Sequence, residues 1–241
     1  MFEPPQPISD ELRRWFADEL RRAKLDAMKE LAYGASHEIN NPLANIALRA
    51  QTLLKREDDV DKRKALEAMH RAAMRAHEMI SDLMLFARPP QLVKAPVDVG
   101  AVAKEVAAEL APRAESAETL LLVANATAPV IVNADAAQLA VALRTAVENS
   151  LDALGQGGEV RLSVDEKAGN AVLRVIDNGP GVPAEIQPHA FDPFFSGREA
   201  GRGLGFGLSK CWRIVTDHGG AVRLDSEPGQ GVTVTITLPK G

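Results

Sequence analysis

The chain reads LEAMHRAAMRAHEMISDLMLFA over residues 66–87, with an apolar or small side chain at every third or fourth position. The positions of this repeat are Leu66, Met69, Ala73, Ala76, Ile80, Leu83 and Ala87. A heptad repeat of this length is typical of a long helix that packs along its side against other helices. The stretch therefore predicts a helical bundle.

A second repeat of the same spacing precedes the first, with one of its positions taken by Arg49. Its positions are Leu25, Met28, Ala32, Ala35, Ile39, Pro42, Ile46 and Leu53. The charged stretch 55–59 separates the two repeats, so residues 10–87 are predicted to form a two-helix hairpin. One hairpin cannot bury two such seams, and we therefore expect a homodimer in which two hairpins form a four-helix bundle.

Beyond the hairpin, the prolines of RPPQLVKAP at residues 88–96 stop the second helix, because proline cannot continue it. Helices and strands then alternate in a pattern that predicts an α/β sandwich of the α+β type. We expect helices at 99–116, 135–154 and 205–217, and strands near 119–124, 130–132, 160–164, 173–175, 221–226 and 232–238. The expected domains are a hairpin at 1–88, a hinge linker at 89–97 and a second domain at 98–241.

The composition favours a soluble globular protein and argues against several other classes. Hydrophobic residues make up 46% and charged residues 25% of the chain, as in soluble globular proteins. The formal net charge of −5 argues against a nucleic-acid binder, whose binding face would be basic. Cys211 is the single cysteine, which excludes an internal disulfide, and no stretch approaches the roughly 18 apolar residues of a membrane span. We expect a cytoplasmic chain, with any membrane-anchored sensor region lying in a longer native protein.

The first motif with chemical potential is SHEINNPL at residues 36–43. His37 falls at heptad position f, pointing away from the predicted seam, and an exposed neutral imidazole is a competent nucleophile towards phosphorus. Glu38 can accept the imidazole proton, and Asn41, on the same helical face, can orient a water. The alternative is a solvated surface histidine.

The second motif lies on the helix expected at 135–154. Thr145, Glu148, Asn149 and Asp152 follow helical spacing and form a polar stripe beside the apolar one. Mg²⁺ prefers oxygen ligands, so Asn149 is a candidate metal ligand, with Glu148 acting directly or through water. The alternative is the solvent face of an amphipathic helix.

The third motif is Asp177-Asn178-Gly179-Pro180-Gly181, directly after an expected strand. The carboxylate of Asp177 can accept a hydrogen bond from the exocyclic amine of adenine, whereas guanine offers an acceptor at that place. Gly179 and Gly181 would let a base approach the backbone without a Cβ in the way. The alternative is an ordinary turn, which Asn-Gly-Pro-Gly favours by itself.

The last two motifs follow one another in the chain and lead into the helix expected at 205–217. The glycines of GRGLGFGL at 201–208 predict an anion site, because free amides and a helix N-terminus favour negative charge. A flexible linker is the alternative. The preceding FDPFFSGR at 191–198 predicts either a mobile lid, from which Arg198 would reach terminal phosphates, or a cluster of core aromatics. The candidate nucleotide contacts in the glycine-rich segment are Gly203, Leu204, Gly205 and Gly207.

Taken in this order, the five motifs resemble the H, N, G1, F and G2 boxes of sensor histidine kinases, and the resemblance covers residues 25–238. It implies that His37 is the phospho-acceptor, that Glu38 assists the transfer and that Asn41 assists dephosphorylation of the partner. Segment 226–233 is similar to the turn and strand that close the family's ATP-binding domain, which adds Thr233 to the expected nucleotide contacts.

Two residues depart from the family pattern. Thr145 stands where relatives often have asparagine, which leaves its contribution open. Asp152 stands where some relatives carry a phosphate-contacting lysine, and a carboxylate there would repel phosphate.

The resemblance implies a fold shared with type II topoisomerases and mismatch-repair ATPases, and ATP and Mg²⁺ as cofactors. It also implies autophosphorylation of His37, relay of the phosphoryl group to an aspartate of a response regulator, and phosphatase activity towards that regulator. An ATPase of the same superfamily and a pseudokinase that binds its partner without turnover are the alternatives.

Overall fold

A computed structural model describes the chain apart from residues 1–9, 88, 125–127, 194, 196–204 and 241, and apart from many side chains between residues 10 and 37 and at 86–87. The chain divides into two compact units, Met1–Pro89 and Pro90–Gly241. Each unit is described by itself.

The first unit is a helical hairpin of α1 (Asp10–Leu54) and α2 (Val60–Ala87), with the break where the charged stretch predicted it. Arg63 fixes the turn, because its Nη1 donates to the backbone oxygens of Leu54 and Glu57, both at 3.0 Å. Asp59 caps α2 by accepting from the backbone N–H of Asp61 and of Lys62. Local hydrogen bonds therefore specify where the hairpin turns.

The face of α1 that packs on α2 lies one residue later than the predicted seam. Its members are half-buried or buried at 3-4 spacing: Asn40, Leu43, Ala47, Ala50 and Leu54. The predicted seam residues Ile39, Ile46 and Leu53 are instead 42%, 48% and 57% exposed. The face towards α2 thus has the predicted spacing but lies one residue later, because two neighbouring apolar faces of α1 share the same period. Burial of the predicted seam between two hairpins stays a prediction.

On α2 the predicted seam is confirmed in most of its described positions. Leu66, Ala73, Ala76, Ile80 and Leu83 are buried or half-buried, whereas Met69 is 56% exposed. Two histidines of α2 add bonds across the hairpin. The Nδ1 of His70 lies 3.2 Å from the backbone oxygen of Ala47, and the Nδ1 of His77 lies 3.1 Å from the Oδ1 of Asn40.

The second unit contains a five-stranded sheet with the order β2-β4-β5-β7-β6. Its strands are β2 (Leu120–Ala124), β4 (Glu159–Lys167), β5 (Asn170–Asp177), β6 (Ala221–Ser226) and β7 (Val232–Pro239). β2 and β4 are parallel, and the other neighbours are antiparallel. The predicted strands are confirmed.

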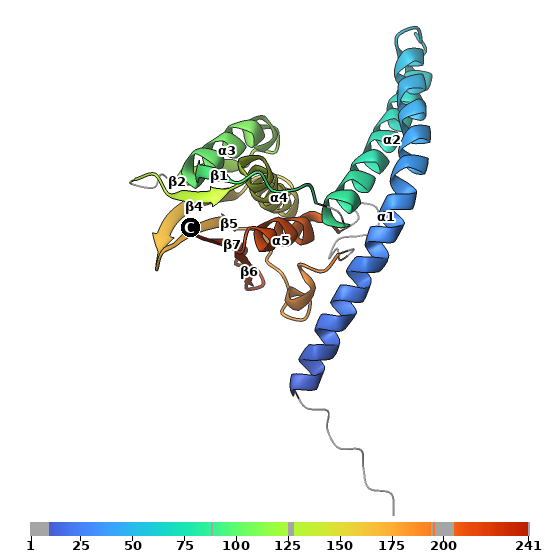
Figure 1. Ribbon diagram of the computed structural model, residues 1–241. Coiled ribbons are helices and arrows are strands. Elements are labelled where there is room, and N and C mark those ends of the chain that lie inside the picture. The colour runs from blue at the N-terminus through green and yellow to red at the C-terminus, as the bar shows by residue number, and fades with distance from the viewer. Residues whose placement is uncertain (1–9, 88, 125–127, 194, 196–204, 241) are drawn as a thin grey trace, which may run out of the picture. The chain divides into compact units, whose positions relative to one another are not determined.

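Three helices cover one face of this sheet (Figure 1): α3 (Val99–Ser116), α4 (Ala136–Leu154) and α5 (Gly207–Asp217). A short 3₁₀ helix, Gln187–His189, lies between β5 and α5. The largest fully buried side chains come from both layers, among them Leu139, Leu143, Val147, Leu162, Leu173, Ile214 and Ile236. Burying each of them contributes about 1.5–3 kcal/mol. The predicted α/β sandwich is therefore correct.

A strand missed by the sequence analysis, β1 (Ala95–Asp98), pairs with β3 (Ile131–Ala134) in a separate two-stranded sheet. A strand paired on one side tolerates Pro96, which has no N–H to donate. The preceding residues are also held: the N–H of Val93 donates to Asp135 Oδ2 at 2.9 Å, and Gln138 Nε2 donates to the backbone oxygen of Pro90 at 3.2 Å. Much of the expected hinge is thus fastened to the second unit.

Asp135 connects this linker to the end of α5. It caps α4 by accepting from the N–H of Gln138, and the hydrogen bond from Val93 is the main cause that lowers its pKa. Its own N–H donates to Nε2 of His218, which is 5% exposed and whose Nδ1 lies 2.8 Å from the backbone oxygen of Ile214. The buried His218 therefore acts as a structural link between α4 and α5.

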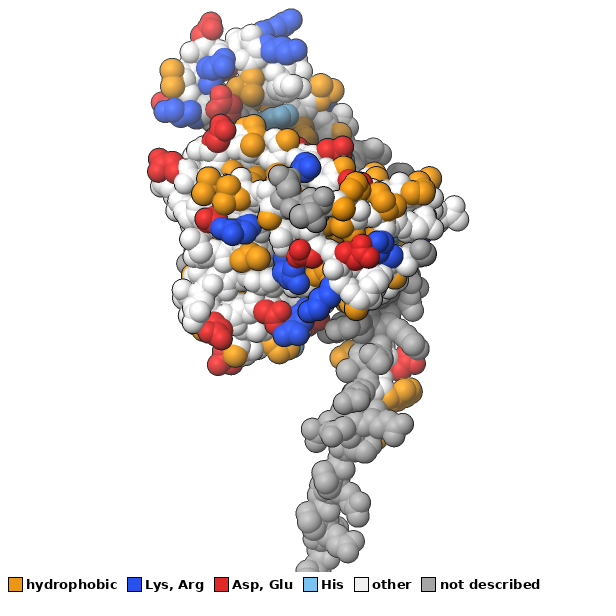
Figure 2. Space-filling view, turned by 90° about the vertical axis from the view of Figure 1, so that its left-hand side faces the viewer, with side chains coloured by type: hydrophobic (Ala, Val, Ile, Leu, Met, Phe, Trp, Pro, Cys, Tyr) orange, Lys and Arg blue, Asp and Glu red, His pale blue; other side chains and the backbone are white. Residues whose placement is uncertain are grey.

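Two observations bear on the predictions about a membrane span and about surface charge. Among the residues that the structure describes, none of the helices combines the length and apolar character needed to cross a bilayer. On the face that Figure 2 shows, basic and acidic side chains are interspersed instead of gathered by sign.

Gly231 offers a test of how closely β5 and β7 approach. Its φ is +83°, and a Cβ there would lie 1.9 Å from the backbone oxygen of Asp177. Gly229, in the same turn, has a φ of +80°, but no atom would lie within 4 Å of a Cβ added there. We expect Gly229→Ala to lower the free energy of unfolding by about 1 kcal/mol through backbone strain, and Gly231→Ala by about 2 kcal/mol more through the clash. Urea denaturation measures both, and equal losses would contradict the prediction.

Candidate functional site

Asp177, at the end of β5, is the centre of the site in the second unit. It is 4% exposed and lies on the helix-covered face of the sheet. Its Oδ1 accepts from the N–H of Gly179 at 3.0 Å and of Val232 at 3.1 Å, and its Oδ2 accepts from the hydroxyl of Ser150 at 2.8 Å. The carboxylate is thus held by a loop, by β7 and by α4.

The loop that follows β5 is fastened to the turn between β6 and β7. The N–H of Val182 donates to Ser226 Oγ at 2.8 Å, and that hydroxyl donates to the backbone oxygen of Gly231 at 2.7 Å. The N–H of Gly229 donates to the backbone oxygen of Pro180 at 2.7 Å. These bonds fix the rim of the site.

Gly179 and Gly181 have structural roles in this loop. A Cβ on Gly181, where φ is +74°, would lie 2.3 Å from the backbone oxygen of Glu227. A Cβ on Gly179 would lie 3.0 Å from Asp177 Oδ1. Internal packing alone therefore favours glycine at both positions, and the approach of a base to them stays a prediction.

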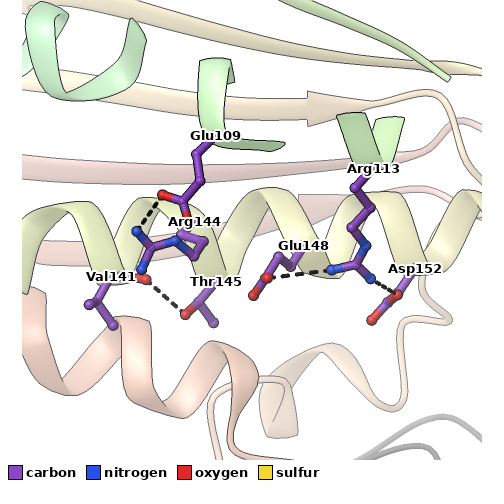
Figure 3. A network of polar contacts seen from close by, with 7 residues as sticks. All are labelled: Glu109, Arg113, Val141, Arg144, Thr145, Glu148 and Asp152. Carbon is purple, nitrogen blue, oxygen red and sulfur yellow. Dashed lines mark hydrogen bonds and ion pairs between the residues drawn. The ribbon is translucent and has the colours of Figure 1, made fainter. Parts of the chain in front are cut away.

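Ion pairs connect α3 to residues of α4 that lie before and after Asn149 in the chain. Figure 3 shows Arg113 between Glu148 and Asp152, with its Nη1 at 3.4 Å from Glu148 Oε1 and its Nη2 bonded to Asp152. One helical turn earlier, Arg144 bonds Glu109 at 2.6 Å. The carboxylate at position 152, which the sequence analysis expected to repel phosphate, therefore has a cation beside it.

Glu148 lies in a charged and partly buried environment. Burial raises its pKa, and the positive charges of Arg113, Lys210 and Arg144 act in the opposite direction. Within the described part of the chain, no cluster of three His, Cys, Asp or Glu residues is arranged to hold a metal. A Mg²⁺ bound mainly by substrate phosphates needs only one or two protein oxygens, so the donors of Asn149 and Glu148 fit such an ion. Their role as ligands stays a prediction.

Thr145 does not share the exposed face of α4 with Glu148. It is 5% exposed, its hydroxyl donates to the backbone oxygen of Val141 at 2.8 Å, and a Cβ on Gly207 would lie 3.8 Å from its Cγ2. The predicted polar stripe therefore begins after Thr145, which packs towards the start of α5.

Thr233 was predicted to contact nucleotide, but the strand register places it elsewhere. It pairs with Ile176, and Val232 pairs with Asp177. Paired residues share a sheet face and neighbours along a strand alternate, so Thr233 lies on the face opposite Asp177. Val232 takes the place beside the carboxylate, to which it donates its N–H. The prediction for Thr233 is therefore wrong in register by one residue.

The glycine-rich segment is described only at its end. Gly205 has a φ of +72°, and Gly207 is the first residue of α5. Phe206, which has no side-chain acceptor for the first amides of the helix, precedes it. Four predicted residues, Phe194, Arg198, Gly203 and Leu204, lie outside the described residues, and Phe191 is half-buried.

In the first unit, His37 lies within α1, and its side chain is outside the described part. Heptad position f was counted from the predicted seam, so the outward direction of His37 stays a prediction. Glu38 and Asn41, three residues apart, are both exposed. Pro42 lies inside the helix and has no N–H to donate to the backbone oxygen of Glu38.

Among the site residues that the sequence analysis missed, Ser150 and Arg113 differ in the signal that the sequence offered. Ser150 interrupts the apolar stripe of α4, three residues after Val147, and a polar residue at such a position was the available signal. Arg113 carried no signal, because its partners on α4 are 35 and 39 residues away in the chain.

Comparison with known families divides the chain in the same order. Residues 27–91 match the His Kinase A (phospho-acceptor) domain. Residues 134–241 match the histidine kinase-, DNA gyrase B- and HSP90-like ATPase.

Among curated proteins, the chain is 32% identical over 230 residues to the sensor histidine kinase ZraS of Escherichia coli K12, covering 94% of the chain and 49% of ZraS. It is 29% identical over 218 residues to sporulation kinase C of Bacillus subtilis 168, covering 90% of the chain and 50% of that kinase. The chain thus spans about half the length of these relatives.

Among solved structures, full-length ShkA in complex with AMPPNP has a TM-score of 0.77 and 26% identity, and the match covers 87% of this chain and 45% of ShkA. ThkA in complex with the response regulator TrrA has a TM-score of 0.68 over 98% of this chain and 68% of that one. Its identity is 21%, so this likeness concerns the fold alone.

The shared cation on α3 leads to a prediction about stability. Arg113→Gln removes the charge that Glu148 and Asp152, four residues apart, have in common. Glu109→Gln breaks the other ion pair between α3 and α4 but leaves these carboxylates their cation. We expect the first variant to lower the free energy of unfolding by up to about 1 kcal/mol and the second by less, since all these side chains are partly exposed.

Urea denaturation at low and high salt measures this difference, which should shrink at high salt as the charges are screened. Equal losses in the two variants at low salt would show that any ion pair between the helices is equivalent.

Proposed function

Because this chain belongs to the sensor histidine kinase family, we propose that it transfers the terminal phosphoryl group of ATP to its own His37. The observation that carries this proposal is the buried carboxylate of Asp177, held open as an acceptor in an ATPase-like domain that follows a phospho-acceptor hairpin. Because ATP is the proposed donor, we propose that the reaction takes place in the cytoplasm.

The adenine base is proposed to bind at Asp177. The carboxylate oxygens accept hydrogen bonds and donate none, so they fit the exocyclic amine of adenine and disfavour the carbonyl that guanine has at that position. The rim formed by segment 179–182 and the turn 227–231 would border the base. The amides of Gly205 and Gly207, with those of Gly203 and Leu204, are proposed to face the phosphates.

Asn149 and Glu148 would hold Mg²⁺, which when bound neutralises phosphate charge. Arg198 is proposed to reach the terminal phosphate. The protein's own contribution is positioning, because phosphoryl transfer asks little covalent chemistry of an enzyme.

In the transfer, an imidazole nitrogen of His37 would attack the terminal phosphorus of ATP, the bond from that phosphorus to the bridging oxygen would break, and ADP would leave with the oxygen. Glu38 would accept the proton that the ring gives up. The exposure of Glu38 and Asn41 supports this proposal, since both must be accessible to a second protein. The product would be a phosphoramidate, from which the phosphoryl group passes to an aspartate of a response-regulator receiver domain. Asn41 would orient the water that, in the phosphatase reaction, hydrolyses the aspartyl phosphate of the regulator and releases inorganic phosphate.

The transfer requires that a phosphate bound in the second unit reach His37 of the first, and we propose that the chain bends for this ahead of Pro90. The bonds of Pro90 and Val93 to α4, and the pairing of β1 with β3, support a linker that travels with the ATP-binding unit. We accordingly move the functional boundary from the predicted 97/98 to the region of Pro89 and Pro90.

The hairpin is proposed to dimerise through the stripe of Ile39, Ile46 and Leu53. These residues recur every seventh position, beside the face that packs on α2, and they are exposed in a single chain. A second hairpin covering this stripe would complete a four-helix bundle.

A charge placed on the stripe tests the dimer. Ile46→Lys should weaken dimerisation at least about tenfold, because a buried lysine must lose hydration without a partner. Leu48→Lys is the matched control, since Leu48 is 60% exposed and lies on the opposite side of α1. Sedimentation equilibrium gives both dissociation constants, and a similar effect of the two lysines would count against this interface.

His37→Gln tests the transfer itself. Incubation with radiolabelled Mg-ATP should label the wild-type chain in an acid-labile form, as expected for phosphohistidine, and leave this variant unlabelled with nucleotide affinity unchanged. His70→Gln is the control, because a glutamine amide can still donate to the backbone oxygen of Ala47. Asp177→Ala and Asn149→Asp should instead weaken nucleotide binding.

The same experiment separates the two alternatives. An ATPase that works through conformational change would release phosphate without labelling His37, and a pseudokinase would bind ATP and do neither. Labelling of His37→Gln at the wild-type level would overturn the assignment of the acceptor.

A further inference from the structure

Ser150, the residue that follows Asn149 in α4, bonds the carboxylate of Asp177, the candidate binding site of the base. It lies on α4, is 3% exposed, and its hydroxyl donates to Asp177 Oδ2 over 2.8 Å. The direction of this bond is fixed, because a carboxylate accepts hydrogen bonds and has no hydrogen to give. Bonds of this kind are shorter and stronger than those between neutral groups.

The acceptor capacity of Asp177 can be counted. A carboxylate has about four lone-pair positions, two on each oxygen. The N–H groups of Gly179 and Val232 take both positions on Oδ1, and Ser150 takes one on Oδ2. Among the described residues, no further donor reaches this carboxylate, so one acceptor position on Oδ2 remains.

We propose that Ser150 is a positioning residue that fixes the orientation of Asp177 and leaves it a single acceptor position, matched to one amino group of a purine base. This inference rests on the proposed binding of ATP. Without the hydroxyl, Oδ2 has two positions open to water, and the carboxylate loses the only bond from α4 that holds this oxygen. Ser150 thereby contributes to the selection of adenine without touching the nucleotide.

A purely structural role for Ser150 predicts something different. A buried hydroxyl that only stabilises the fold would, when removed, weaken all nucleotides alike or none. Selection through Asp177 affects only ligands that carry the exocyclic amine. The two roles are therefore separated by comparing ATP with purine riboside triphosphate, which has hydrogen in place of that amine.

The experiment measures the dissociation constants of both nucleotides, with Mg²⁺, for the full chain and for Ser150→Ala. The wild type should prefer ATP. In the variant we expect ATP to bind about tenfold more weakly and purine riboside triphosphate within about twofold of the wild-type value, so that the preference shrinks. Thr119→Val is the control: it removes another buried hydroxyl, which bonds the backbone oxygen of Gly157, and should leave the preference unchanged.

Each outcome decides a separate point. A wild type that binds neither nucleotide, or both equally, overturns the proposed adenine site itself. A wild type that prefers ATP, with an undiminished preference in Ser150→Ala, overturns the role of Ser150 alone. Thermal unfolding checks that the variants are folded. If Ser150→Ala is not, Ser150→Cys, which keeps a weak donor of similar size, should give a preference below that of the wild type, and an unchanged preference would again refute the inference.

Discussion

A carboxylate leaves water only where hydrogen-bond donors replace its hydration, and the ATP-binding unit meets that requirement at Asp177. The donors come from a loop, from β7 and from α4, so the register of the sheet and the position of the helix must both be correct before the carboxylate is satisfied. The close approach of Gly231 follows from the same constraint. A site built in this way is rigid before ligand arrives, which favours selective binding.

The linker is part of the same arrangement. Val93 bonds the cap of α4, the backbone of that cap bonds the buried His218, and His218 ends α5. The segment that leads to the hairpin is therefore joined to both helices that border the candidate nucleotide site. A displacement of the linker would act on α4 and α5 together, which is the kind of connection that the proposed signalling function requires.

In the hairpin, α1 has two neighbouring apolar faces, of which one packs on α2 and the other is the proposed dimer surface. The face of Ala47 and Ala50 is small and lets α2 approach closely, whereas the larger Ile46 and Leu53 remain exposed beside it. Both faces have the same seven-residue period. This shared period explains why the sequence revealed the heptads and the hairpin turn but did not show which of the two faces packs on α2.

By itself the sequence determined the helices, most strands, the α/β sandwich and the order of the motifs, because periodicity, caps and glycine-rich turns act over a few residues. Tertiary structure alone decided which face of a helix or strand meets a neighbour. It turned Thr145 into the core, set Thr233 opposite Asp177, brought Arg113 to Glu148, and placed the hydroxyl of Ser150 against a carboxylate 27 residues away. These contacts depend on strand register and helix rotation, where a one-residue shift moves a side chain to another face, and no local pattern fixes that choice.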